Sequence, residues 1–404
     1  MSTINVKEIT GGFTAVPGFL ASGIHAGLKK EKPDLALLYN PRLCSAAGVF
    51  TTNAVKAAPL LLSMERLKEG CAHGVVINAG NANACNGSRG MDDAKAMALA
   101  AAKELGVDEK YMLVSSTGVI GVPMPMDKIL PGIARAAREL SAAGGRKAAQ
   151  AIMTTDLITK EHAVKLEIAG ETVTIGGMAK GSGMIHPRMA TMLAFIATDA
   201  AVDAGTLKAA LKQVVDDTFN MITVDGDTST NDSVVILASG EARNRPIKEG
   251  TPEYNIFLAG LTAVCTKLAQ DIAMDGEGAT TLLEVVVKNA PTLADARLAA
   301  RAVAGSNLFK CAVFGQDANW GRILCAVGYS GARFDPQRVD IYIGDEQVAK
   351  DGGGLAFNEE RAAEILSSDR VTVTVDLKEG EYSATAWGCD LTYEYVRING
   401  SYRT

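Results

Sequence analysis

The segment from Lys180 to Leu193 constrains the fold more than any other part of the chain. Gly181, Gly183 and Pro187 disfavour a helix there, because glycine lowers helix propensity and proline pushes the preceding residue toward extended geometry. The apolar run 192–196 follows directly and is short enough for a buried strand. An irregular loop therefore leads into a strand, and a single hydroxyl residue, Thr191, stands at the join.

Thr191 has the chemistry of a candidate nucleophile. A threonine hydroxyl reacts poorly unless a base lies beside it. Cleavage just before Thr191 would supply that base as an α-amino group, whose pKa of about 7.7–8.0 leaves a useful neutral fraction, unlike lysine at about 10.4. The segment thus predicts self-cleavage between Ala190 and Thr191. The alternative from the residues alone is a structural threonine that begins a strand.

Length and composition limit the class of protein. A chain of 404 residues exceeds the size at which one core stops growing, so we expect two lobes. Hydrophobic residues make up 48% and aromatic residues only 5%, which favours tightly packed α/β layers. The net charge is −6 and no basic tract occurs, so we expect no nucleic-acid partner.

The cysteines and the N-terminal region indicate the compartment. Seven cysteines are scattered and never form a Cys-x-x-Cys pair, which is typical of free thiols in a reducing compartment. The first ten residues are polar and unlike a signal peptide, and no apolar run approaches the roughly 18 residues of a membrane span. We expect a soluble, cytoplasmic protein without a membrane partner.

Strand-like and helix-like segments alternate, which predicts an α/β fold. The expected strands are 35–38, 75–77, 112–114, 163–168, 172–175, 192–197, 233–237, 282–287, 339–343 and 371–375. The expected helices are 93–105, capped by Asp92, and 127–142, 204–219, 252–274, 292–304 and 358–366. Natural seams lie in the loop before Thr191 and near residues 289–292.

The processing segment and five further blocks resemble the ornithine acetyltransferase (glutamate N-acetyltransferase) family. The five blocks are 76–85, 115–121, 219–232, 275–280 and 395–404. They occur in the family's order and cover nearly the whole chain. The resemblance implies an αββα sandwich of the self-processing threonine-nucleophile type with a smaller additional lobe near 290–380. It also implies an alpha chain of residues 1–190 and a beta chain of residues 191–404.

The resemblance implies roles for further residues. Thr117 and Gly118 match the family's oxyanion hole, where a hydroxyl and a backbone N–H stabilise the tetrahedral intermediate. Five other residues match substrate-binding positions, in addition to Thr191: Thr154, Lys180, Glu277, Asn399 and Thr404. Lys180 could pair with a carboxylate. Glu277 lies between two glycines after a long helix, and we expect it to be exposed, where an acid can meet an amine.

An acidic stretch and three departures from the family's pattern also bear on the expected site. The acidic stretch 225–232 lacks the glycine and glutamate of an EF-hand, so we expect a polar turn beside the active site and no metal. Thr281 stands where the family usually has lysine, which could alter how substrate charge is handled. Arg188 and Ala318 also depart from the family's pattern, and Arg188 puts the rate of cleavage in question.

The expected reaction moves an acetyl group from N2-acetyl-L-ornithine to L-glutamate through an acetyl-threonine intermediate. The resemblance implies small-molecule substrates, no cofactor, acetyl-CoA as a candidate second donor, and a dimer of cleaved protomers. Two alternatives stay open at this point. One is an N-terminal-nucleophile amidase or aminopeptidase of related fold, and the other is a non-catalytic binding protein that retains the fold.

Overall fold

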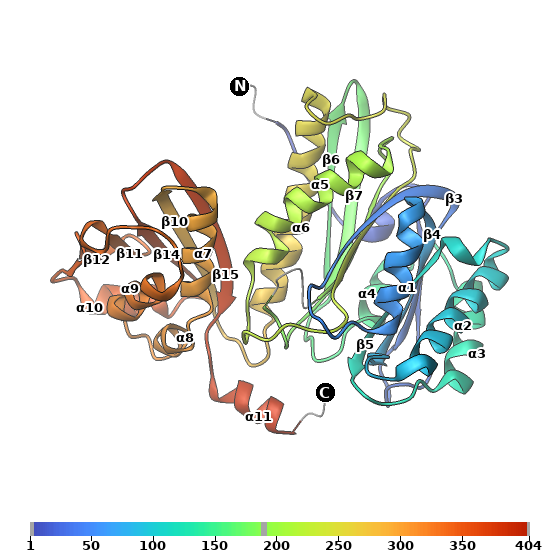
Figure 1. Ribbon diagram of the computed structural model, residues 1–404, viewed down its shortest axis with the longest axis horizontal. Helices are drawn as coiled ribbons and strands as arrows, with labels where there is room; N and C mark the ends of the chain where they lie inside the picture. Colours follow the sequence, from blue (N-terminus) through green and yellow to red (C-terminus); the bar gives the residue numbers. More distant parts are fainter. Residues whose placement is uncertain (1–3, 187–191, 402–404) are drawn as a thin grey trace.

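The computed structural model describes residues 4–186 and 192–401 and contains a larger and a smaller lobe (Figure 1). The larger lobe holds a nine-stranded sheet with the order β1-β6-β7-β8-β9-β3-β4-β5, and β2 pairs with β3. Its strands are β1 (Lys7–Ile9), β2 (Leu20–Ile24), β3 (Leu35–Phe50), β4 (Cys71–Asn81), β5 (Met112–Val119), β6 (Lys160–Ile168), β7 (Glu171–Lys180), β8 (Leu193–Thr198) and β9 (Ser233–Ala238).

The long strand β3 joins two halves of this sheet. Its first residues pair with β2 and β4, and its last residues pair with β9. Leu35 and Leu37 pack in one hydrophobic cluster, whereas Leu38 packs in another together with Phe195 of β8 and Ile77 of β4. Because successive side chains of a strand point to opposite faces, the second cluster lies between the two halves. The halves therefore pack face to face.

Helices cover both outer faces of this double layer. On one side α6 packs on β6 and β7, and on the other α2 packs on β5 and α3 on β3 (Figure 1). The expected αββα sandwich is thus confirmed. The helices of this lobe are α1 (Ala58–Arg66), α2 (Gly87–Leu105), α3 (Met126–Arg138), α4 (Gly145–Ala151), α5 (Ala204–Asp217) and α6 (Pro252–Met274).

The smaller lobe has a six-stranded sheet with the order β13-β12-β11-β14-β10-β15. Its strands are β10 (Leu282–Ala290), β11 (Asp340–Ile343), β12 (Glu346–Lys350), β13 (Gly353–Gly354), β14 (Arg370–Asp376) and β15 (Tyr382–Cys389). Its helices are α7 (Leu293–Ala304), α8 (Asn307–Phe314), α9 (Trp320–Tyr329) and α10 (Glu359–Leu366). The second sheet therefore begins before the seam near 290, because β10 precedes it.

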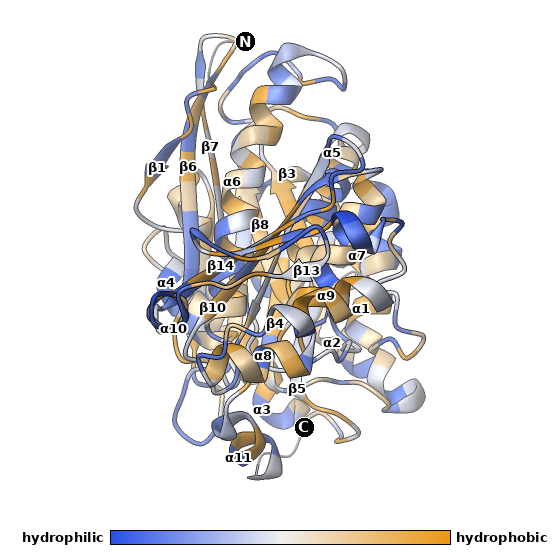
Figure 2. Cartoon of the chain, turned by 90° about the vertical axis from the view of Figure 1, so that its left-hand side faces the viewer, coloured by the Kyte–Doolittle hydropathy of each residue, from blue (hydrophilic) through white to orange (hydrophobic). Residues whose placement is uncertain are grey.

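Polarity differs between the helices of this lobe. Figure 2 views the smaller lobe face on and shows a mainly hydrophobic α9 and, at the opposite side of the lobe, a mainly hydrophilic α10. A last helix, α11 (Tyr393–Ser401), follows β15 and lies below the larger lobe (Figure 1). It brings the end of the chain back toward the residues that follow α6.

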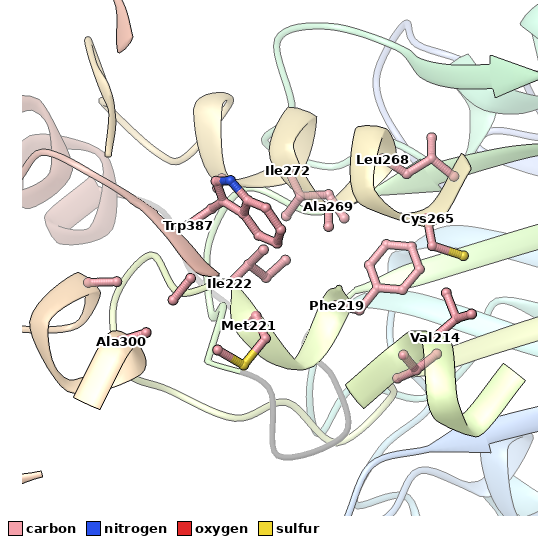
Figure 3. Close-up of a cluster of buried hydrophobic side chains, with 14 of the residues drawn as sticks. Val214, Phe219, Met221, Ile222, Cys265, Leu268, Ala269, Ile272, Ala300 and Trp387 are labelled. Carbon is pink, nitrogen blue, oxygen red and sulfur yellow. The ribbon is translucent and has the colours of Figure 1, made fainter. Parts of the chain in front are cut away.

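The two lobes meet at a hydrophobic contact. Trp387 of β15 lies over Ile222, with Ile272 of α6 beside them (Figure 3). The backbone also pairs there, because the amide of Thr223 donates to the carbonyl of Trp387 at 2.9 Å. Trp387 is 6% exposed, so this contact is sealed from solvent.

Helix α6 is the most apolar long helix of the larger lobe. It is the one helix among the described residues that is long and apolar enough, by length and composition alone, to cross a membrane. Its residues Phe257, Leu261 and Leu268 are buried in the core of the larger lobe. The run of apolar residues is that of a core helix packed on a sheet.

The expected strands all lie within or against observed ones, but two helices differ at their ends. Helix α2 begins at Gly87 after Asn86, six residues before the predicted start, so Asp92 is not its cap. Helix α3 ends at Arg138, because the backbone of Ser141 instead pairs with Ala21 of β2. A sequence pattern cannot show a partner strand that is more than a hundred residues away.

Candidate active site

The site lies where β7 ends and where β8 and β9 begin, close to the end of β5. A cleft of about 190 Å³ opens there. It is lined by Ala82, Thr117, Gly118, Ile120, Thr154, Thr155, Lys180, Gly183, Met184, Met192, Leu193, Asp225, Asp227, Ser229, Thr230, Asn231, Asp232, Glu277, Tyr395 and Asn399. Six of the residues proposed from the sequence therefore share one cavity, although they come from five separate segments.

Thr117 and Gly118 end β5 in an unusual backbone conformation. Gly118 has φ +131°, and a Cβ there would overlap the backbone of Gly80 and Asn81 in the neighbouring β4. Only glycine permits both the positive φ and this close approach. Asn231 holds the same loop from the other side, since its amide donates to the carbonyl of Ser116 at 2.8 Å. The backbone of β4 and the side chain of Asn231 thus set the position of Thr117 and Gly118.

Lys180 is the last residue of β7 and is buried with its amine near a carboxylate. Its Nζ lies 3.9 Å from Oδ2 of Asp156. The same carboxylate accepts the backbone N–H of Thr154 at 2.9 Å. Burial alone would raise the pKa of Asp156, but the charges of Lys180 and Lys160 outweigh it and hold that pKa well below its ordinary value. Asp156 is therefore anionic and joins two of the proposed binding residues.

Glu277 corrects the expectation of an exposed side chain, because it is only 7% exposed. The glycines on either side let the backbone fold back into the cleft, where its N–H donates to the carbonyl of Ser182 at 3.0 Å. Asn399 of α11 donates to Oε2 of Glu277 at 2.7 Å. The two proposed binding residues are thus in direct contact, 122 positions apart in the sequence.

The acidic turn 225–232 lies beside the cleft, as the sequence predicts. The carboxylate of Asp225 accepts the backbone N–H groups of Met184 and Ile185 at 2.6 and 2.8 Å. Thr228 donates to the carbonyl of His186 at 2.9 Å. These bonds hold the start of the loop that leads toward Thr191. Near the same turn, Ser182 donates to the backbone carbonyl of Asp275 and His186 contacts Thr223.

The cleft is predominantly anionic. Among its described lining residues, Lys180 is positively charged, whereas Asp225, Asp227, Asp232 and Glu277 are acidic. Burial raises the pKa of Tyr395, and the nearby carboxylate of Asp225 raises it further, so its phenol stays neutral. This charge distribution favours a ligand with an amine at one end and a carboxylate at the Lys180 end.

Five residues discussed from the sequence lie outside the described residues: Pro187, Arg188, Ala190, Thr191 and Thr404. Met192 and Leu193, which follow Thr191 in the sequence, line the cleft. Thr281 is not part of it, because its backbone and hydroxyl bond to Asp390 and Ser368. Its expected influence on substrate charge therefore lacks a direct contact in this structure.

The sequence interpretation missed the residues that support this site. Asp156, Lys160 and Asp275 are buried and were given no role, and Asn231 was expected only as part of the polar turn. The one signal was that Asp156 and Asp275 each stand two residues from a proposed binding position, and acidic residues are usually solvated on the surface. Among residues 4–186 and 192–401, no group of three or more His, Cys, Asp and Glu side chains is placed to hold a metal ion.

Comparison with known proteins decides the family. The model of the ArgJ family matches residues 20–404. The chain belongs to the ArgJ family. Two ArgJ relatives, each named arginine biosynthesis bifunctional protein ArgJ, match along their whole length. The relative from Symbiobacterium thermophilum is 59% identical over 99% of this chain, and that from Caldanaerobacter subterraneus is 56% identical over 98%.

A solved ArgJ structure is also similar. The arginine biosynthesis bifunctional protein argJ from Bacillus halodurans is 47% identical, with a TM-score of 0.50 over 50% of this chain and 96% of the solved chain. The family resemblance seen in the sequence is confirmed. So is the expected class of protein, an acetyltransferase enzyme of arginine biosynthesis.

Proposed function

We propose that this enzyme moves an acetyl group from N2-acetyl-L-ornithine to L-glutamate through an ester on Thr191. The observation that carries the proposal is the shared cleft, in which the proposed oxyanion pair, Thr117 and Gly118, meets Lys180 and Glu277. Among its described lining residues, one lysine and several acids suit a substrate that carries both a carboxylate and an amine. Membership of the ArgJ family supports the same reaction.

The proposed reaction has two balanced steps. Thr191 Oγ attacks the acetyl carbon of N-acetylornithine, its proton passes by way of the free α-amine of Thr191 to the leaving nitrogen, and ornithine departs. The amine of glutamate then attacks the ester, N-acetylglutamate forms, and Thr191 regains its hydroxyl. Thr117 and Gly118 stabilise the oxyanion in both steps, and each such donor is typically worth about 10²–10³ in rate.

We propose that the enzyme first cuts itself between Ala190 and Thr191. Thr191 Oγ attacks the Ala190 carbonyl, the amide becomes an ester, and water releases the alpha chain 1–190 and the beta chain 191–404. The half-length solved chain from Bacillus halodurans supports this, since the full-length relatives match end to end. We also propose that Thr404 contributes to substrate binding, so an extension of the C-terminus should damage activity.

Mass spectrometry tests the cleavage. The purified protein should give fragments of 190 and 214 residues, and the Thr191→Ala variant should stay a single inactive chain of 404. Efficient cleavage of Thr191→Ala would remove the assignment of the nucleophile. An intact, fully active wild-type chain would contradict both steps.

Substrate assays test the transfer and separate it from an amidase. With N-acetylornithine, acetylglutamate should form only when glutamate is added; release of free acetate at the same rate without glutamate would instead indicate hydrolysis. We include acetyl-CoA as a second donor because the relatives are named bifunctional, and a donor panel tests it. We also propose that the enzyme is cytoplasmic, which its seven free cysteines support. We further propose that it forms a dimer of cleaved protomers, and sedimentation analysis tests that oligomeric state.

A further inference from the structure

A buried lysine lies behind the cleft at the junction of its three binding segments. Lys160 begins β6, and its side chain is completely buried. Its Nζ lies 2.8 Å from Oδ1 of Asp156 and 2.5 Å from Oδ2 of Asp275. Asp275 follows α6 directly. Lys160 therefore joins the turn before β6 to the end of α6, and neither aspartate lines the cleft.

Each aspartate holds segments that do line the cleft. Asp156 accepts the backbone N–H groups of Thr154 at 2.9 Å and Gly181 at 2.7 Å, and it pairs with Lys180. These bonds fix both the segment that carries Thr154 and the end of β7. The carboxylate thus serves Thr154 and Lys180 at once.

Asp275 serves the third segment. Its backbone carbonyl accepts the hydroxyl of Ser182 at 2.7 Å, and its carboxylate accepts the N–H of Leu157 at 3.0 Å. Two residues later, Glu277 donates its own N–H to Ser182. Lys160 is thereby connected through two aspartates to Thr154, Lys180 and Glu277, which lie up to 123 positions apart in the sequence.

Burying the charges of Lys160, Asp156 and Asp275 costs free energy of folding. A buried ion pair loses hydration that an apolar group of the same size would not lose, so burial of charge by itself is weak evidence for stability. The ion pairs instead fix the positions of the two carboxylates, and each carboxylate fixes the chain segments whose backbone N–H groups it accepts. An apolar residue at position 160 could fill the volume but could not hold two aspartates in place.

We propose that Lys160, through Asp156 and Asp275, is a positioning residue that sets the separation between Lys180 and Glu277. That separation determines the length of the diamino acid that the cleft accepts, so Lys160 contributes to substrate selectivity without touching the substrate. This inference rests on the proposed function.

The test compares Lys160→Met with a matched control in the smaller lobe. Lys378 likewise joins two aspartates, Asp340 at 2.6 Å and Asp351 at 2.9 Å, but it does not line the cleft. Each variant is assayed for self-cleavage by mass spectrometry. Initial rates then give kcat and KM for N2-acetylornithine and for its longer homologue N2-acetyllysine.

For Lys160→Met we expect complete cleavage and a kcat within about threefold of wild type. The KM for acetylornithine should rise about 10- to 100-fold, as displacement of binding groups by about 1 Å can cost that much. The preference for acetylornithine over acetyllysine should fall by at least about tenfold. Lys378→Met should leave both KM values and the preference unchanged.

If cleaved Lys160→Met had the same KM values as wild type and the same preference for acetylornithine over acetyllysine, the inference would be overturned, since a purely structural lysine would behave in that way. If Lys160→Met does not accumulate, Asp156→Asn decides by the same readouts, because it keeps the volume and one acceptor but loses the charge. An unaltered protein that transfers no acetyl group would instead refute the proposed function, so the two failures are distinguishable.

Discussion

Two lysines of this enzyme, one in each lobe, each form ion pairs with two aspartates of the same lobe. The two clusters differ in the chain segments that they connect. Lys160 is fully buried and connects three chain segments that line the cleft. Lys378 is 29% exposed and connects β14's end to β11 and the turn after β12. A lysine paired with two aspartates therefore positions the segments of the active site in the larger lobe, whereas in the smaller lobe it contributes to local stability.

Burial explains the difference. In the larger lobe the aspartates have exchanged water for backbone N–H groups, so they have few alternative positions. In the smaller lobe Asp351 is largely exposed and can exchange its lysine for water at little cost.

The largest expected effect is on stability. Lys160→Met leaves the buried carboxylate of Asp275 without its cation and leaves Asp156 with Lys180 alone, and breaking a buried pair typically costs about 3–5 kcal/mol of unfolding free energy. Urea unfolding followed by circular dichroism measures it. The double variant Lys160→Met/Asp275→Asn should recover part of the loss because one unpaired charge is removed. A loss as small as that of Lys378→Met would contradict the contrast between the lobes.

The next effect tests the oxyanion loop. Gly118→Ala must displace the backbone of β4 and leave its positive φ, so self-cleavage and acetyl transfer should both slow by about 10²- to 10³-fold. Gly106→Ala is the control, since Gly106 also has positive φ, at +68°, but a Cβ there meets nothing within 4 Å. It should lower stability only. Normal rates in Gly118→Ala would dismiss this loop as the oxyanion site.

A smaller effect is expected for the amide that supports the same loop. Asn231→Ala leaves the carbonyls of Ser116 and Ala82 without their donor, and an unsatisfied buried acceptor costs about 1–3 kcal/mol. We expect cleavage and turnover to slow together by about tenfold. Asn244→Ala, which removes buried amide bonds to Ala201 far from the cleft, should spare both rates. Slowing of turnover alone would indicate a substrate contact instead.

The smallest effect concerns the pH dependence of the smaller lobe. Hydrogen bonds from Lys378 to Asp340 and Asp351 raise the pKa of that lysine to about 12. A raised lysine pKa means that the folded state holds its proton more tightly than the unfolded state. The stability lost in Lys378→Met should thus be constant below pH 10.5 and shrink as the pH rises toward 12. Thermal unfolding of both proteins across this range measures it, and a difference that grows with pH would refute the pairing.

Much of the fold could be predicted from the sequence because local patterns carry it. Alternating or continuous apolar runs mark β3, β4, β8 and β9, and the periodic helix α6 was predicted with its observed ends. Short helices such as α8 and α9 were missed, since they are held by packing on each other and on α7 more than by a long periodic pattern of their own. Their formation depends on packing more than on propensity.

The sequence by itself determined the family, the order of the longer strands and helices, and the candidates Thr117, Lys180, Glu277 and Asn399, because these depend on residue types in recognisable local order. Only the tertiary structure decided that Glu277 is buried against Asn399 and that Lys160 joins the binding segments through Asp156 and Asp275. Burial and ion pairing between distant segments arise from long-range packing, and the spacing of residues along a chain does not contain that information.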